Sequence, residues 1–297
     1  MHSALAAVLR LFFLLFSCIP ARWCGAIGAG LGRLVFLIDG RHRKVALDNL
    51  SMVYAKRPSS WHKRIARESF AEMGRTVMEL PHVYMRSKAS LLACVEIEGK
   101  EVLDTALASG DGVMLMACHH SNWELGALVF SMLGYKTHII YRPLNQPSVE
   151  DIVKTARERF GAQFHARTAP MRWLLQALKN HDVVCVMVDQ HMSTGTVVPF
   201  LGHPAYTTLL PASMHSKRET PLLCVAARRI GRDFRFRINV WRPRLKDGGD
   251  PISIMSNIMG DFAPIIEERP ELWLWMHKRW RVEQDVAAGS EAAHGAS

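Results

Sequence analysis

The segment from His119 to Glu124, with the sequence His-His-Ser-Asn-Trp-Glu, combines the residue types of general acid–base chemistry. An imidazole can take a proton from a hydroxyl group, and a carboxylate can hold the imidazole in place. The segment lies between two apolar runs, residues 113–118 and 125–133. We therefore expect His119 at the end of a buried strand and Glu124 in the first turn of the next helix, where they can meet. Such a pair would activate a hydroxyl for acyl transfer.

Three other interpretations of the same segment stay open. Ser121 and Glu124 have the spacing of a capping box, in which Glu124 would only close the helix N-terminus. Cys118 is a candidate thiol nucleophile, although side chains alternate along a strand and it should face away from His119. A metal site is the third, with His119, His120, Glu124, Asp189 and His191 as its ligands. Since no spacing such as HExxH supports a metal site, we expect no metal.

Polar residues also follow two other predicted strands. Arg142 follows the run 137–141, and Asp189 and Gln190 follow the fully apolar run 183–188. Active sites of open α/β sheets gather at the carboxyl ends of strands. An arginine there can grip phosphate oxygens with two hydrogen bonds, but arginine is equally common in surface ion pairs, and aspartate often caps a helix. We expect a substrate-binding set formed by Asn122, Arg142, Asp189 and Gln190.

The pattern along the chain predicts an α/β protein with a central, largely parallel sheet flanked by helices. Short, fully apolar runs are typical of strands buried on both faces, and here they alternate with amphipathic stretches. The expected strands are 95–97, 113–118, 137–141, 183–188, 222–228 and 234–240. The expected helices are 44–56, 60–86, 99–109, 123–133, 150–160, 171–179 and 253–269. Pro81 should end or kink the second of these helices, and Pro270 should end the last.

Residues 4–38 are mostly apolar and are interrupted at Pro20. They are compatible with a signal peptide, one uncleaved anchor, a helix pair bent at Pro20 that enters the membrane without crossing it, or a buried pair of core helices. The region around Pro20 lacks the small residues of a cleavage site, and neither stretch is a clean span of about 20 apolar residues. We expect an anchor or helix pair over residues 1–40, a catalytic domain over 41–285 and a disordered tail over 286–297. The basic residues that follow the first helix predict a cytoplasmic catalytic domain.

The formal net charge of +10 over 297 residues indicates an acidic partner. The candidates are an anionic membrane surface, an acidic carrier protein and nucleic acid. Zinc-finger spacings, RNP-like aromatic motifs and basic heptad regions are missing, so we expect no nucleic acid. The six cysteines form no CxxC pair and most lie in apolar runs, which is typical of a reducing compartment.

Several segments together resemble the bacterial lipid A late acyltransferase family, also called the lauroyl/myristoyl acyltransferases. The likeness extends from about residue 10 to residue 281. His119 and Glu124 match the family's His-x4-acid signature. The other matching segments are Val45–Leu50, Tyr141–Asn145, Val188–Gln190, Val198–Gly202 and Pro270–Trp280.

This resemblance implies transfer of a fatty acyl group from an acyl carrier protein thioester to a hydroxyl of a lipid A precursor, on the cytoplasmic side of the bacterial inner membrane. It implies His119 as the general base and Glu124 as the residue that orients it. Backbone amides at the start of helix 123–133 would stabilise the oxyanion. No cofactor is implied beyond the phosphopantetheine arm that the donor carries. Another glycolipid or aminolipid acceptor, a hydrolase of the same fold and a catalytically silent lipid-binding protein stay open.

Overall fold

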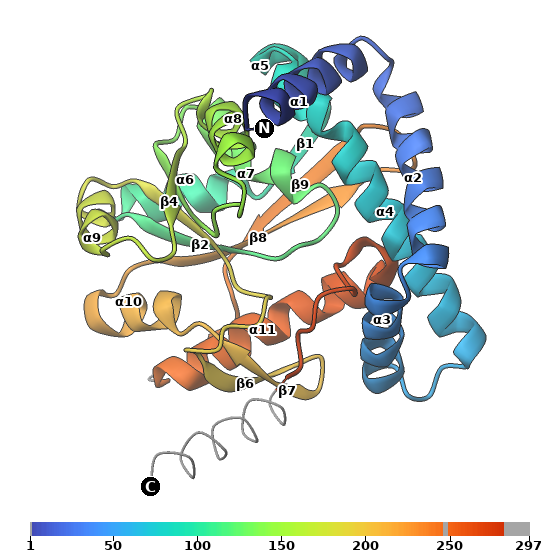
Figure 1. Ribbon diagram of the computed structural model, residues 1–297. Helices are drawn as coiled ribbons and strands as arrows, with labels where there is room; N and C mark the ends of the chain where they lie inside the picture. The colour runs from blue at the N-terminus through green and yellow to red at the C-terminus, as the bar shows by residue number, and fades with distance from the viewer. Residues whose placement is uncertain (1, 246–248, 282–297) are drawn as a thin grey trace, which may run out of the picture.

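The computed structural model describes residues 2–245 and 249–281, so the tail expected at residues 286–297 lies outside them. Its centre is a seven-stranded sheet in the order β1-β9-β8-β2-β5-β3-β4 (Figure 1). The strands are β1 Val95–Glu98, β2 Val113–Ala117, β3 Thr137–Tyr141, β4 Gln163–Ala166, β5 Val183–Met187, β8 Leu222–Arg229 and β9 Phe236–Trp241. Every pairing in this sheet is parallel except that of β8 with β9. The expected α/β class with a largely parallel sheet is therefore confirmed.

Helices lie on both faces of the sheet. The helices are α1 His2–Ser17, α2 Ala21–Ile38, α3 Gly40–Val53, α4 Ser59–Met85, α5 Lys88–Leu92, α6 Lys100–Ala108, α7 Trp123–Met132, α8 Pro147–Glu158, α9 Arg172–Lys179, α10 Leu210–Arg218 and α11 Pro251–Glu268. A short 3-10 helix, η1, covers Pro270–Leu272, and β6 Thr196–Phe200 pairs with β7 His203–Thr207 as a separate antiparallel hairpin. In Figure 1 the hairpin lies below the sheet, beside α11.

Alternation along the strands divides the interior into two cores. On β2, Met114 and Met116 pack on the side of α9, α10 and α11, whereas Val113 and Leu115 pack on the side of α6 and α7. A strand that is apolar at every position can serve both cores, because successive side chains point to opposite faces. The parallel pairing of β8, β2, β5 and β3 places their carboxyl ends at one edge of the sheet, where polar groups can gather.

The expected strands and helices are all present, with boundaries that differ by a few residues. The expected helix over residues 60–86 is α4, which continues through Pro81 to Met85, so of the two effects expected of Pro81 an end of the helix does not occur. The residues from Pro81 to Tyr84 are all buried, and this packing outweighs the hydrogen bond that a proline removes. Sequence patterns missed β4, α5, α10 and the β6–β7 hairpin, which are short or only partly apolar.

The N-terminal region is a helix pair that bends at Pro20, between α1 and α2. One face of α2 packs along α4 through glycines. A Cβ atom built on Gly28 would lie 2.3 Å from the carbonyl oxygen of Gly74, and one on Gly32 would lie 2.0 Å from that of Phe70. The backbones therefore approach as closely as glycine allows. The anchor expected over residues 1–40 thus packs directly on the rest of the protein.

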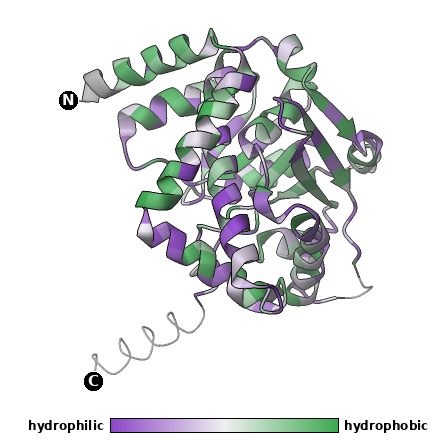
Figure 2. Ribbon diagram, turned by 90° about the vertical axis from the view of Figure 1, so that its right-hand side faces the viewer, coloured by the Kyte–Doolittle hydropathy of each residue, from purple (hydrophilic) through white to green (hydrophobic). Residues whose placement is uncertain are grey.

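The opposite face of α2 carries large apolar side chains that no other part of the described chain covers. Trp23 is 55% exposed, Leu37 65% and Ile38 72%, and Leu11, Leu14 and Leu15 of α1 are exposed as well. Figure 2 looks onto this side of the molecule and shows α1 as a largely hydrophobic helix at its upper edge. Within the described residues, Ala21–Ile38 is one helix that is long and apolar enough to cross a membrane, and 39% of it is buried. One face of this helix pair therefore packs on the rest of the protein, and the other face exposes apolar side chains.

We predict opposite effects for an added methyl group at two glycines of α2. Gly28→Ala should lower the free energy of unfolding by about 1–3 kcal/mol, since the new Cβ overlaps the α4 backbone. Gly30→Ala, in the same helix, has no atom within 4 Å of its new Cβ and should be neutral or stabilising by about 0.5–1 kcal/mol. Denaturant unfolding followed by circular dichroism measures both. Equal midpoints for the two variants would contradict the close packing of α2 on α4.

Candidate active site

His119 lies where β2 and β5 end side by side. In the parallel register of these strands Ala117 is opposite Met187, so the residues two positions further, His119 and Asp189, come together. The Nδ1 atom of His119 lies 2.7 Å from Oδ1 of Asp189, and the backbone N–H of His119 donates to Oδ2 at 2.7 Å. The carboxylate that contacts His119 is therefore that of Asp189, which was expected to bind substrate.

Asp189 is 1% exposed, and its carboxylate interacts with His119 and Trp273. Burial by itself raises the pKa of a carboxyl group, but the neighbouring His119 and the indole N–H of Trp273, 2.8 Å from Oδ2, bring the pKa of Asp189 below its ordinary value. An ionised Asp189 has no proton to donate, so Nδ1 of His119 carries one. The lone pair of the imidazole is then on Nε2, which faces the amide nitrogen of Gln190 at 3.2 Å. This is the tautomer that a general base requires.

The segment that carries Trp273 is held by two distant helices. Ser69 of α4 donates to the carbonyl oxygen of Trp273 at 2.7 Å, and the side-chain amide of Asn49, on α3, donates to the carbonyl oxygens of Trp275 and His277, both at 2.8 Å. Three segments of the family resemblance, around Asn49, Asp189 and Trp273, thus meet behind one histidine.

Glu124 does not orient His119, contrary to the sequence-based expectation. Its Oε2 atom accepts from the hydroxyl of Tyr84 at 2.8 Å and from Nε of Arg157 at 2.9 Å. Among the described residues, the hydrogen bonds of the His119 ring are those to Asp189 and Gln190. Burial and the charge of Glu124 raise the pKa of the Tyr84 phenol, so that it remains a donor. The reason for the difference is that α7 turns the Glu124 side chain toward α4 and α8.

Asn122, expected to bind substrate, is completely buried and fully engaged. Its side-chain oxygen accepts from the backbone N–H of Leu125 at 3.0 Å, which makes it the N-cap of α7, and its amide donates to Glu79 at 3.1 Å. In the structure Asn122 is therefore a helix cap with no exposed surface. The capping box was also wrong, since the cap is Asn122 and not Ser121. Glu79 is itself paired with buried Arg229 at 2.8 Å, so the start of α7 is anchored in a buried charge network.

The turn between β2 and α7 leaves two backbone donors next to His119. Ser121 has a positive φ of 56°, a left-handed conformation in which its N–H donates to the carbonyl oxygen of Leu272 at 2.8 Å. The N–H of Leu125 is satisfied by the N-cap, as described above. In the described part of the chain the N–H groups of Trp123 and Glu124 have no hydrogen-bond partner. They are the free donors at the positive end of the helix dipole, and the Trp123 ring lies 5.2 Å from that of His119.

Arg142 and Gln190, two other expected substrate ligands, are exposed at the same edge of the sheet. Arg142 follows β3, which is the neighbour of β5, so that His119, Asp189 and Arg142 follow three adjacent strands. Within residues 2–245 and 249–281, Arg142 makes no hydrogen bond or ion pair. Its charge is therefore available to an anionic group, and it is not part of a surface ion pair.

The two alternative chemistries find little support in the geometry. Cys118 is 2% exposed and packs in the core on the α11 side, and burial raises the pKa of its thiol well above the ordinary value. It is thus a protonated core residue that faces away from His119. No group of three or more His, Cys, Asp or Glu side chains with metal-binding geometry occurs in the described residues.

Several residues around the site carry no signal that sequence patterns could detect. Trp273 lies within a family signature that assigns it no role, Tyr84 carries no distinguishing pattern, and Arg157 resembles any solvated residue of an amphipathic helix. His277 accepts from the backbone N–H of His191 at 3.0 Å. Burial, with smaller contributions from His119 and Arg279, lowers the pKa of His277 to about 4 even though Asp189 opposes the shift.

We predict that Glu124 and Arg157 stabilise the protein as a pair. Glu124→Gln should lower the free energy of unfolding by about 3–5 kcal/mol, because it leaves the mostly buried Arg157 guanidinium uncompensated. The double variant Glu124→Gln/Arg157→Gln should lose less than the sum of the two single variants. Asp48→Asn, which breaks the exposed pair with Lys44, is the control and should leave stability nearly unchanged. Additive effects at 124 and 157 would contradict the pairing.

We also predict a pH dependence of stability that originates at His277. Because its folded pKa of about 4 lies below the ordinary 6.5, the unfolded chain binds the proton more readily. Stability is therefore full above pH 6.5 and decreases as the pH falls toward 4, by at most about 1.4 kcal/mol per pH unit for this group. His277→Gln should reduce that slope by one proton in denaturant titrations across this range. An unchanged slope would show that His277 is not buried in its neutral form.

Comparisons with known proteins show the family of this chain. The family model described as bacterial lipid A biosynthesis acyltransferase matches residues 3–282. The lipid A biosynthesis myristoyltransferase of Escherichia coli (strain K12) is 23% identical over 268 residues, which cover 87% of this chain and 81% of that protein. The lauroyltransferase of the same strain is 22% identical over 270 residues, covering 87% and 85%.

A third relative is named for a different lipid. The phosphatidylinositol mannoside acyltransferase of Mycobacterium tuberculosis (strain ATCC 25618 / H37Rv) is 29% identical over 220 residues, which cover 72% of this chain and 68% of that protein. The family match spans nearly the whole chain and includes the histidine, its buried carboxylate and the segments that hold them. The protein is therefore an acyltransferase and belongs to the bacterial lipid A biosynthesis acyltransferase family.

Proposed function

We propose that this acyltransferase is membrane-associated and moves a fatty acyl chain from an acyl carrier protein thioester to a hydroxyl of a lipid A precursor. The observation that supports the chemistry best is the His119–Asp189 pair. The buried carboxylate holds a proton on Nδ1 of His119 and leaves Nε2 free to act as a base. The relatives named for lipid A biosynthesis support the acceptor class.

The proposed reaction needs no acyl-enzyme. The acceptor hydroxyl takes the position of the Gln190 amide at Nε2 of His119 and gives its proton to that nitrogen as its oxygen attacks the thioester carbonyl carbon. Asp189 stabilises the imidazolium that forms. When the tetrahedral intermediate collapses, the carbon–sulfur bond breaks and the thiolate of the phosphopantetheine arm receives the proton from Nε2. The products are an ester and a free carrier thiol, and no metal or bound cofactor takes part in these steps.

The N–H groups of Trp123 and Glu124 are our candidates for the donors that stabilise the oxyanion. In this scheme Glu124 contributes by position rather than by contact with His119. Its side chain, held by Arg157 and Tyr84, fixes the first turn of α7 and with it the amides of Trp123 and Glu124. A catalytic contribution of Glu124 thus stays a prediction. Glu124 would act by fixing the start of α7 and not by orienting His119.

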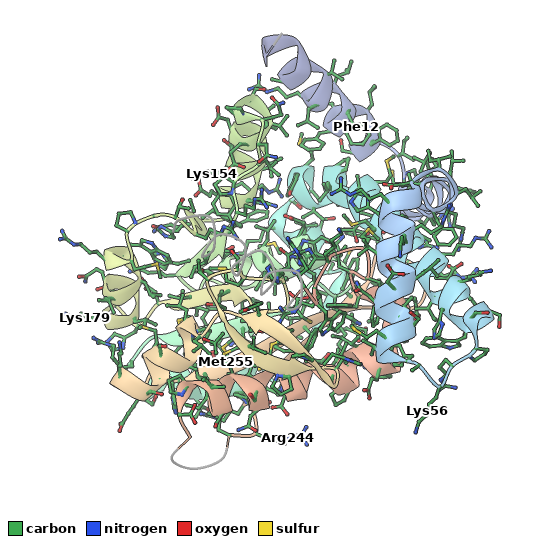
Figure 3. All side chains as sticks on the ribbon, turned by 60° about the horizontal axis from the view of Figure 1, so that its bottom comes forward. Phe12, Lys56, Lys154, Lys179, Arg244 and Met255 are labelled. Carbon is green, nitrogen blue, oxygen red and sulfur yellow. The ribbon has the colours of Figure 1, made fainter. Side chains whose placement is uncertain are left out.

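An apolar cavity of about 670 Å³ between α1 and α8 is our candidate for the acyl chain. Figure 3 shows these two helices, marked by Phe12 and Lys154, standing next to each other. The lining includes Phe13, Leu14, Ile152 and Ala156, and also Tyr84, whose hydroxyl reaches Glu124. A chain placed there would extend from the start of α7 toward the apolar surface of α1.

Charge and exposed apolar surface support the proposed partners. Arg142, which has no ion pair in the described chain, is placed to hold a phosphate or sugar-acid group of the acceptor. The net charge of +10 is suited to an acidic carrier protein and to an anionic membrane surface. The exposed apolar face of α1 and α2 would keep the protein at the inner membrane, with the catalytic domain on the cytoplasmic side.

A second acceptor class is favoured by one observation. The mycobacterial relative is named for a phosphatidylinositol mannoside, and it is similar to this chain over most of its length. Another glycolipid is therefore the alternative acceptor. Mass spectrometry of total lipids from cells with and without the gene distinguishes the two, since the lipid that loses one acyl chain identifies the acceptor.

We predict that His119→Ala and Asp189→Asn each reduce acyl transfer by a factor on the order of 10²–10⁴. The first variant removes the base, and the second no longer holds the proton of His119 on Nδ1. Purified protein, acyl carrier protein thioester and lipid acceptor are assayed for the acylated product. Cys118→Ala is the control and should stay active, since that thiol is buried in the opposite core.

Two outcomes would contradict this proposal. Retained activity in Asp189→Asn would show that the buried carboxylate does not serve the base. Donor consumption that is as fast without acceptor as with it would identify a hydrolase instead.

A further inference from the structure

A second cavity, of about 550 Å³, lies between α2, α4 and the turn that joins β8 to β9. Arginines from all three elements line it, together with one carboxylate. The lining residues are Arg22, Trp23, Ala26, Ala29, Arg33, Arg75, Arg232 and Asp233. None of them belongs to the candidate catalytic set at His119. The turn that joins β8 to β9 nevertheless lies at the same edge of the sheet as His119, because β8 runs parallel to β2.

The positive charge of this cavity is only partly compensated. Arg33 is paired with Glu68 at 2.7 Å, and Arg75 is paired with Glu72 at 3.0 Å. Arg22 and Arg232 form no ion pair within the described part of the chain, and Asp233 is the one carboxylate in the lining. The start of α2 adds the positive end of its dipole, and its N-cap Pro20 provides no side-chain hydrogen bond. The cavity therefore carries a surplus of positive charge.

The site adjoins the exposed apolar face of α2. The cavity is lined by Ala26, Ala29 and Arg33 of α2. On another face of the same helix, Ile27 is 44% exposed and Leu31 is 47% exposed. Trp23 belongs to both surfaces, and the guanidinium of Arg22 lies 5.6 Å from the centre of its ring. Tryptophan and arginine with this arrangement are typical of the boundary between lipid headgroups and acyl chains. A ligand that fits both surfaces has an anionic headgroup and hydrocarbon tails.

We propose that this cavity binds the phosphate headgroup of an anionic phospholipid, whose acyl chains lie along the exposed face of α2. Arg22 and Arg232 provide the charge that the protein itself leaves unpaired. The lipid acts as a docking ligand and not as a substrate, since the cavity shares no residue with the catalytic set. Binding there would bring the edge of the sheet that carries His119 toward the bilayer surface.

The test compares two double variants that remove the same charge from the full-length protein. Arg22→Gln/Arg232→Gln changes the cavity, and Arg172→Gln/Lys179→Gln removes two exposed cations from α9. Figures 1 and 3 show that α9, marked by Lys179 in Figure 3, lies on the opposite side of the molecule from α2. Co-sedimentation with vesicles of phosphatidylcholine, with and without phosphatidylglycerol, measures binding. Acyl transfer in detergent solution verifies that both variants are folded, and it separates a failure of this proposal from a failure of the catalytic one.

The cavity variant should bind phosphatidylglycerol vesicles roughly ten- to thirty-fold more weakly than the unchanged protein, and the α9 variant should change by no more than about two-fold. Binding to pure phosphatidylcholine should be the same for all three. An equal loss in both double variants would show that binding depends on net charge alone and would contradict a specific site in this cavity. If inorganic phosphate raises the melting temperature of the unchanged protein but not of the cavity variant, while vesicle binding is equal, the ligand is a free anion and the lipid proposal is wrong.

Discussion

The hydrogen bond between the His119 ring and the buried carboxylate of Asp189 is the interaction on which the candidate active site depends. A buried charge is costly unless it is paired and hydrogen-bonded, and Asp189 meets both conditions through His119 and the indole of Trp273. The same partners that stabilise the carboxylate also determine which nitrogen of His119 is basic. Stability and chemistry are thus coupled at one residue, and the C-terminal segment becomes part of the site because it provides Trp273.

Helix α4 connects this site to the rest of the molecule. Along its length Ser69 holds the Trp273 segment, Glu79 holds the N-cap Asn122 of α7, and Tyr84 holds Glu124. Its other side carries Gly74, against which α2 packs at backbone distance. One long helix therefore contacts three parts of the candidate site and the N-terminal pair at once. A rigid connection of this kind explains how a surface that we propose to rest on a membrane can have a defined position relative to His119.

The sequence patterns predicted most of the architecture because β2 and β5 are apolar at every position and the helices are amphipathic, both of which are local properties. They also predicted His119, Arg142, Asp189 and Gln190 at one edge, since that follows from the strand ends of a parallel sheet. The hairpin β6–β7 and α10 were missed because their residues mix apolar and polar types without a clear period. Asn122 was expected to bind substrate although it is an N-cap, because a polar residue next to a candidate catalytic histidine has the same appearance in either role.

The amino-acid sequence alone predicts a histidine at a strand end, a set of nearby polar residues and an N-terminal helix pair interrupted at Pro20. Which carboxylate serves the histidine was decided only by the tertiary structure. Glu124 is five residues away along the chain, yet α7 directs it to Arg157 and Tyr84, whereas Asp189, seventy residues away, is placed opposite His119 by the register of β2 and β5. The physical reason is that strand pairing brings residues together through hydrogen bonds between distant segments, and no local spacing encodes that register.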